Sequence, residues 1–171
     1  MIIHSEQEML DFGKSFADNH ASTGDGCGGG PLPSLRGGGG QQPTGPVETK
    51  AQQDSSSAVV IELIGDVGAG KTTFVRGLAE GLSITEPITS PSFTISKSYA
   101  LPHSRGYLIH YDFYRLQDPG LMADDLAESI ANPDNIVIIE WGESITDLLP
   151  KDHTTINIEY TETGDRACSV L

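Results

Sequence analysis

The chain has 171 residues, with 24 acidic and 10 basic side chains and a formal net charge of −14. A chain of this length is expected to fold around one hydrophobic core. Its acidic surface would repel phosphate backbones, which argues against direct, unaided binding of nucleic acid. The sequence contains no apolar run long enough for a membrane helix, no secretion signal, and no disulfide or metal-ligand spacing of its two cysteines. We expect a soluble, cytoplasmic protein with no membrane partner.

The first predicted element is an amphipathic helix over residues 5–18. Ser5 and Glu8 have the spacing of a capping box, which marks a helix start. Met9 and Phe12 follow at helical intervals. The helix therefore has one apolar face that must pack against the rest of the domain.

Polar and glycine-rich residues are concentrated in the next segment, residues 20–57. It contains the runs GDGCGGGP and RGGGGQQP, has no Phe, Trp or Tyr, and shows no apolar periodicity. Such a segment cannot bury enough apolar surface to offset the entropy lost on ordering it. We predict one domain over residues 1–171 that is interrupted by a low-complexity, disordered insert at 20–57.

Beyond the insert, short apolar runs alternate with helical patterns. Helices are predicted over residues 72–82 and around residues 121–131, the second ended by Asn132 and Pro133. Strands alternating with helices predict an α/β layered domain with a largely parallel sheet and an antiparallel C-terminal hairpin. The predicted strands are residues 58–64, 93–99, 107–112, 135–140, 154–160 and 166–171.

A phosphate-binding motif lies between the first of these strands and the following helix. Residues 65–72 read GDVGAGKT, which satisfies the pattern G-x-x-x-x-G-K-[ST]. The glycines allow backbone N–H groups to curl around an anion, Lys71 can reach the β- and γ-phosphates, and the Thr72 hydroxyl can ligate Mg²⁺. The sequence therefore predicts a three-layer P-loop NTPase domain.

A P-loop needs an acid on a second strand to hold the metal ion. Glu140 follows the apolar run IVII, and Asp112 follows the run YLIHY. Both acids end strands that are expected to neighbour the P-loop strand in a parallel sheet. One would hold the metal ion and the other would orient water or a switch, and the pattern leaves the assignment open. His110 could stabilise charge there or be a structural histidine.

Three further features are compatible with a nucleotide site. Residues 90–94, SPSFT, supply hydroxyls and a rigid turn where many NTPases place a switch that senses the γ-phosphate. Arg115 could contact phosphate or a partner, or form a surface salt bridge. Trp141, the only tryptophan, could lie beside the nucleotide or pack in the core.

Four sequence blocks together closely resemble the bacterial TsaE family, also called YjeE. They are residues 65–74 (GDVGAGKTTF), 90–94 (SPSFT), 110–116 (HYDFYRL) and 140–141 (EW). The P-loop alone is generic, whereas the four blocks in this order are specific. The match spans nearly all of the chain outside the insert.

The resemblance implies a compact α/β P-loop ATPase that binds ATP or ADP with Mg²⁺ and hydrolyses ATP slowly on its own. It implies the partners TsaB and TsaD, which in the family transfer a threonylcarbamoyl group to the adenosine at position 37 of tRNAs that read codons beginning with A. The family's ATPase does not perform this transfer and is thought to reset the complex between turnovers. An acidic subunit that does not bind RNA fits this role.

The resemblance also implies roles for individual residues. Thr72 and Glu140 would hold Mg²⁺, and Asp112 and Lys71 would serve hydrolysis. The phosphates would be held by Gly68, Ala69, Gly70, Lys71, Thr72 and Thr73.

Other positions correspond to the edge of the nucleotide site. Trp141 would lie beside the nucleotide, and Ser92 would belong to the switch, where the family usually has threonine. Glu6 and Arg166 match positions near the nucleotide only loosely. The glycine-rich insert is a second departure, because the usual compact form of the family lacks it.

Two other functions remain open at this stage. A small-molecule kinase would use the same P-loop, but such enzymes usually carry an arginine-rich lid, and this chain has only five arginines: Arg36, Arg76, Arg105, Arg115 and Arg166. A nucleotide-sensing module without physiological turnover would need no hydrolytic acid. A GTPase is disfavoured, because the sequence has no N-K-x-D motif.

Overall fold

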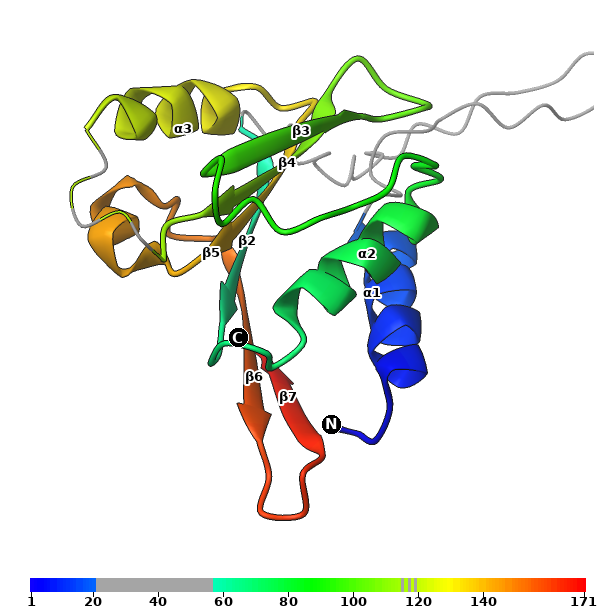
Figure 1. Ribbon diagram of the computed structural model, residues 1–171. Helices are drawn as coiled ribbons and strands as arrows, with labels where there is room; N and C mark the ends of the chain where they lie inside the picture. Colours follow the sequence, from blue (N-terminus) through cyan, green and yellow to red (C-terminus); the bar gives the residue numbers. More distant parts are fainter. Residues whose placement is uncertain (21–56, 115, 117, 119) are drawn as a thin grey trace, which may run out of the picture.

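The computed structural model describes residues 1–20, 57–114, 116, 118 and 120–171 (Figure 1). The predicted insert lies outside the described residues except at its two ends, and so does Arg115. In the part of the chain that the structure describes, no helix is long and apolar enough to cross a membrane.

Four parallel strands form the centre of a seven-stranded sheet in the described residues, whose order is β1-β7-β6-β2-β5-β4-β3. The P-loop strand β2 (Val59–Ile64) pairs with β5 (Ile136–Glu140) on one side and β6 (Thr154–Tyr160) on the other. Strand β4 (Tyr107–Asp112) pairs with β5. The carboxyl ends of all four strands therefore meet at one edge, where parallel sheets collect ligands.

The outer strands run antiparallel to their neighbours. β3 (Ser96–Ala100) runs against β4, and β7 (Arg166–Val170) runs against β6. The short strand β1 (Ile2–Ile3), which the sequence analysis missed, completes the edge beside β7. The predicted antiparallel C-terminal hairpin is confirmed, and a second antiparallel pair closes the opposite edge.

Helices cover both faces of the sheet (Figure 1). α1 (Glu6–His20) and α2 (Lys71–Gly81) cover one face, where the core includes Ile61 and Leu63 of β2. α3 (Leu121–Ala131) and the 3₁₀ helix η1 (Gly142–Leu148) cover the other face, where the core includes Val60 of the same strand. The three-layer α/β architecture is confirmed.

Close packing of α1 against α2 fixes the helix that follows the P-loop. A side chain at Gly77 would place its Cβ 2.1 Å from the carbonyl oxygen of Leu10, so only glycine allows this approach. The ring of Phe74 lies 5.2 Å from that of Phe12 and 5.7 Å from that of Phe16. The predicted cap is also present, because the Glu8 N–H donates to Ser5 Oγ at 3.2 Å.

Two sequence-based predictions need correction. The strand predicted over 93–99 begins only at Ser96, because the N–H groups of Thr94 and Ile95 both donate to the Pro91 carbonyl and Ile95 has a φ of +67°. The strand of Asp112 does not neighbour the P-loop strand, since β5 lies between β4 and β2. Local sequence did not indicate η1, which follows β5 directly.

Candidate nucleotide-binding site

The P-loop turns from β2 into α2 through backbone conformations that favour glycine. Gly65 has a φ of +151°, and a Cβ there would lie 2.3 Å from the carbonyl oxygen of Ile158. Gly70 has a φ of +112° and is the N-cap of α2, where no side chain accepts a hydrogen bond from the helix end. The amino end of α2 therefore carries no side-chain cap that would compete with an anion for its backbone N–H groups.

Lys71 is buried at the first turn of α2. Its Nζ donates to the carbonyl oxygens of Gly65 at 2.7 Å and Asp66 at 3.1 Å. The same Nζ lies 3.7 Å from Glu140 Oε2 and 4.6 Å from the centre of the Trp141 ring. The lysine therefore links the first two residues of the P-loop to the start of α2 and places its positive charge beside the buried Glu140 carboxylate.

Glu140 ends β5 and is buried beside the P-loop. Its Oε1 accepts a long hydrogen bond from the Thr72 hydroxyl at 3.5 Å and lies 2.9 Å from Nε2 of His110. The structure thus brings together Lys71, Thr72 and Glu140, as the sequence predicts. It also adds His110, whose contact with Glu140 depends on the pairing of β4 with β5 and which the sequence left open.

The donor set here fits Mg²⁺. A hydroxyl and a carboxylate are hard oxygen ligands, the type that Mg²⁺ prefers. The described part of the chain contains no cluster of three or more His, Cys, Asp or Glu residues suited to a metal ion. Mg²⁺ usually takes one or two protein ligands and completes its shell with phosphates and water.

Asp112 lies next to Glu140 in the register of β4 and β5 and is also buried. Its Oδ2 accepts hydrogen bonds from the hydroxyls of Ser92 and, at 3.4 Å, Ser90. Its Oδ1 accepts the N–H of Tyr114 at 3.0 Å. Asp112 therefore ties the predicted switch, residues 90–94, to the strand end beside the acid of the candidate metal site.

Aromatic rings line the rim of this cluster. Trp141 has a φ of +59°, which turns the chain immediately after Glu140. Its ring lies 4.9 Å from that of Tyr114, and it also packs against the core on the α3 face. Trp141 thus packs against the core, as one of the two readings predicts, and its place beside the nucleotide stays a prediction.

The two loosely matched positions differ in their surroundings. Arg166 lies beside the P-loop, with Nε donating to the carbonyl oxygen of Ala69 at 3.3 Å and the guanidinium 4.8 Å from the centre of the Tyr160 ring. Glu6 forms an exposed ion pair with Arg76 at 3.0 Å. A nucleotide contact by either residue stays a prediction.

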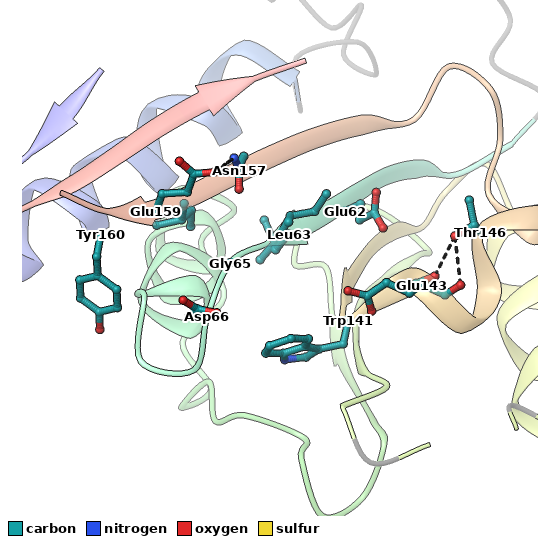
Figure 2. Close-up of a pocket in the computed structure, with 13 residues that line it drawn as sticks. Glu62, Leu63, Gly65, Asp66, Trp141, Glu143, Thr146, Asn157, Glu159 and Tyr160 are labelled. Carbon is teal, nitrogen blue, oxygen red and sulfur yellow. Dashed lines mark hydrogen bonds between the residues drawn. The ribbon is translucent and has the colours of Figure 1, made fainter. Parts of the chain in front are cut away.

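A cavity of about 750 Å³ lies beside the P-loop, toward η1. Trp141 and Glu143 lie on one side of it, and Glu159 and Tyr160 on the other (Figure 2). Among the described residues, the lining contains no lysine or arginine, and its carboxylates are those of Glu62, Asp66, Glu143 and Glu159. These charges would repel phosphate, so the amino end of α2 is the better phosphate site.

A comparison with solved structures supports the fold. The chain resembles the crystal structure of YdiB from Bacillus subtilis with a TM-score of 0.63. The match covers 99% of this chain and 82% of YdiB at 24% sequence identity. At this identity, the likeness establishes the shared architecture only.

Sequence comparisons establish the family. Residues 41–168 match the family described as "Threonylcarbamoyl adenosine biosynthesis protein TsaE". The tRNA threonylcarbamoyladenosine biosynthesis protein TsaE of Treponema pallidum is 40% identical over 111 residues, which cover 65% of this chain and 80% of the relative. The protein of the same name from Nostoc sp. is 41% identical over 114 residues, covering 65% of this chain and 68% of the relative. The chain therefore belongs to the TsaE family of threonylcarbamoyl adenosine biosynthesis proteins.

Proposed function

We propose that this chain is a P-loop ATPase that binds Mg-ATP and acts with TsaB and TsaD. The modification it serves is N6-threonylcarbamoyladenosine at position 37 of tRNAs that read codons beginning with A. The observation that carries the proposal is the convergence of Lys71, Thr72 and Glu140 at the amino end of α2. The membership of the TsaE family supports the pathway.

Each residue of the cluster has a role that its surroundings support. Thr72 and Glu140 would hold Mg²⁺, which when bound would neutralise phosphate charge. Lys71 would exchange the carbonyl oxygens of Gly65 and Asp66 for the phosphates. Asp112 would orient the attacking water and accept its proton, because it is the second buried carboxylate at this strand end.

The hydrogen bonds of Asp112 support slow hydrolysis by the chain alone. Both of its oxygens accept hydrogen bonds, from Ser90 and Ser92 on one side and from the Tyr114 N–H on the other. Release by residues 90–94 would free Oδ2 of this carboxylate to orient water. Phe93 in this segment is 86% exposed, so a partner protein that contacts the segment could drive that release.

The charge of the chain supports an indirect role at tRNA. A net charge of −14 disfavours contact with a phosphate backbone. In this function the partner proteins bind tRNA, and this chain hydrolyses ATP.

ATP hydrolysis by the purified chain, alone and with TsaB and TsaD from the same source, tests the proposal. We expect the two partners to stimulate hydrolysis and Lys71→Ala to abolish it. Lys14→Ala is the matched control, because Lys14 forms an exposed pair with Glu80 on the outside of the α1–α2 layer, and it should leave hydrolysis unchanged.

Two other outcomes would contradict the proposal. Transfer of the γ-phosphate to a small molecule would indicate the kinase. Tight nucleotide binding with no stimulated hydrolysis would indicate the sensing module.

A further inference from the structure

His110 is a completely buried histidine in the middle of β4, with 0% of its surface exposed. Its Nε2 lies 2.9 Å from Oε1 of Glu140. Its other ring nitrogen, Nδ1, is buried and has no hydrogen-bond partner, the only such side-chain atom in the described part of the chain. Nε2 thus has a hydrogen-bond partner, and Nδ1 has none.

An unsatisfied buried nitrogen lowers the free energy of unfolding. The neutral ring leaves a lone pair on Nδ1 without a donor, and the charged ring leaves an N–H without an acceptor. An apolar side chain of similar size would fill the same volume without this cost. Packing therefore does not explain a histidine at this position, whereas the contact of Nε2 with Glu140 does.

The contact with His110 is the shortest of the three that fix the Glu140 carboxylate. The Thr72 hydroxyl is 3.5 Å from Oε1, and the Lys71 Nζ is 3.7 Å from Oε2. Both are long for hydrogen bonds. A glutamate side chain has three rotatable bonds, so without His110 the carboxylate would be free to leave the orientation that faces the P-loop.

We propose that His110 is a positioning residue, which donates its Nε2–H to Glu140 and so holds this carboxylate toward Thr72 and Lys71. A carboxylate that ligates a metal ion is typically held by such a hydrogen bond from a second residue. The inference rests on the proposed function, because that function makes Glu140 a ligand of Mg²⁺.

The test compares ADP binding with Mg²⁺ and with EDTA, measured by calorimetry. In His110→Phe, the ring volume is kept and the hydrogen bond is lost. The gain in ADP affinity that Mg²⁺ provides should fall about tenfold, whereas the affinity in EDTA should stay within about twofold. The thermal unfolding temperature should change little, because the unsatisfied nitrogen is gone while the buried Glu140 carboxylate loses its shortest hydrogen bond.

Two amide variants provide the matched controls. His110→Gln places an amide N–H near the position of Nε2 and should restore most of the Mg²⁺-dependent gain. His110→Asn places its amide near Nδ1, too short to reach Glu140, and should lose it. This pair decides the question if His110→Phe fails to fold.

The outcomes separate this inference from the function on which it rests. A wild-type chain that binds ADP no better with Mg²⁺ would overturn both. A normal Mg²⁺-dependent gain in the wild type that survives in His110→Phe, or in both amide variants, would overturn the positioning role alone. Equal loss of affinity with Mg²⁺ and with EDTA would also overturn it, because that result indicates general damage to the fold.

Discussion

The buried polar side chains of β4 have different partners on the two faces of the sheet. Toward α2, His110 and Asp112 of β4 are buried and bonded to groups from β5 and from residues 90–94. Toward α3, Tyr111 of the same strand donates to Asp125 at 2.7 Å and contacts Ser129 at 2.9 Å, and so fastens α3 to the sheet. The large cavity on this second face is open and lined by carboxylates (Figure 2).

This difference shows that the volume of a cavity does not identify the candidate phosphate-binding site in this molecule. A phosphate group needs backbone N–H donors and a cation, and those lie at the buried cluster around Lys71. The cavity offers volume and negative charge instead. We therefore expect a phosphate ligand on the α2 side to replace internal hydrogen bonds, and substitutions on the two faces to have separable effects.

The largest effect is expected for Asp112→Asn. The amide keeps the shape of the side chain but loses the charge, so hydrolysis stimulated by TsaB and TsaD should fall by about 10²-fold or more. The affinity for ADP should stay within about threefold, because Asp112 does not belong to the P-loop. Single-turnover hydrolysis and calorimetry measure the two quantities.

Asp125→Asn on α3 is the control for this substitution and should leave stimulated hydrolysis unchanged. Full hydrolysis by Asp112→Asn would contradict the assignment of Asp112. It would leave this carboxylate as a support for residues 90–94.

Much of the α2-side cluster can be predicted from sequence, because its signals are local. The P-loop pattern spans eight residues, and each acid directly follows its own apolar run. The order of the strands cannot be predicted this way, since it depends on crossover connections between distant segments. For this reason the sequence predicts β4 next to β2, where the structure has β5, and does not predict the contact of His110 with Glu140.

Two of the three non-glycine residues with positive φ in the described part of the chain lie beside the site, and the third, Ser83, follows the end of α2. Ile95, where β3 should already have formed, and Trp141, which turns the chain into η1, both have positive φ values. For residues with a Cβ, such conformations are set by tertiary contacts rather than by propensity. Sequence pattern alone therefore gives the wrong start for β3 and does not predict η1, the two elements that set the positions of residues 90–94 and of the Trp141 ring.

A smaller effect, on stability alone, is expected for Tyr111→Phe. Loss of the hydroxyl removes two hydrogen bonds and leaves their partners unpaired, so the free energy of unfolding should fall by about 1–2 kcal/mol. Urea denaturation measures this change. The affinity for ADP should not change, because Tyr111 faces α3; a loss of more than about tenfold would show that the two faces are coupled.

The same variant has a pH signature. Burial, and then the hydrogen bond to the Asp125 carboxylate, raises the pKa of Tyr111 well above its ordinary value. A raised pKa in the folded state means that the contribution of the neutral phenol is complete below about pH 10 and is lost as the pH rises beyond it. Unfolding curves between pH 8 and 11 should therefore show a loss of stability in the wild type that Tyr111→Phe lacks in part.

The smallest effect is expected in the cavity, for the double variant Glu143→Gln and Glu159→Gln. Both side chains are exposed, and a glutamine amide oxygen can still accept the hydrogen bond that Glu159 takes from Asn157 at 2.7 Å, so the main change is the loss of long-range repulsion. The affinity for ADP should rise by no more than about threefold at low salt, and the gain should vanish at about 0.5 M salt, where charges are screened within a few ångströms. Calorimetry at two salt concentrations measures both values. A tenfold loss of affinity would contradict the placement of the nucleotide on the α2 side, because it would mean that the nucleotide makes direct contacts in the cavity.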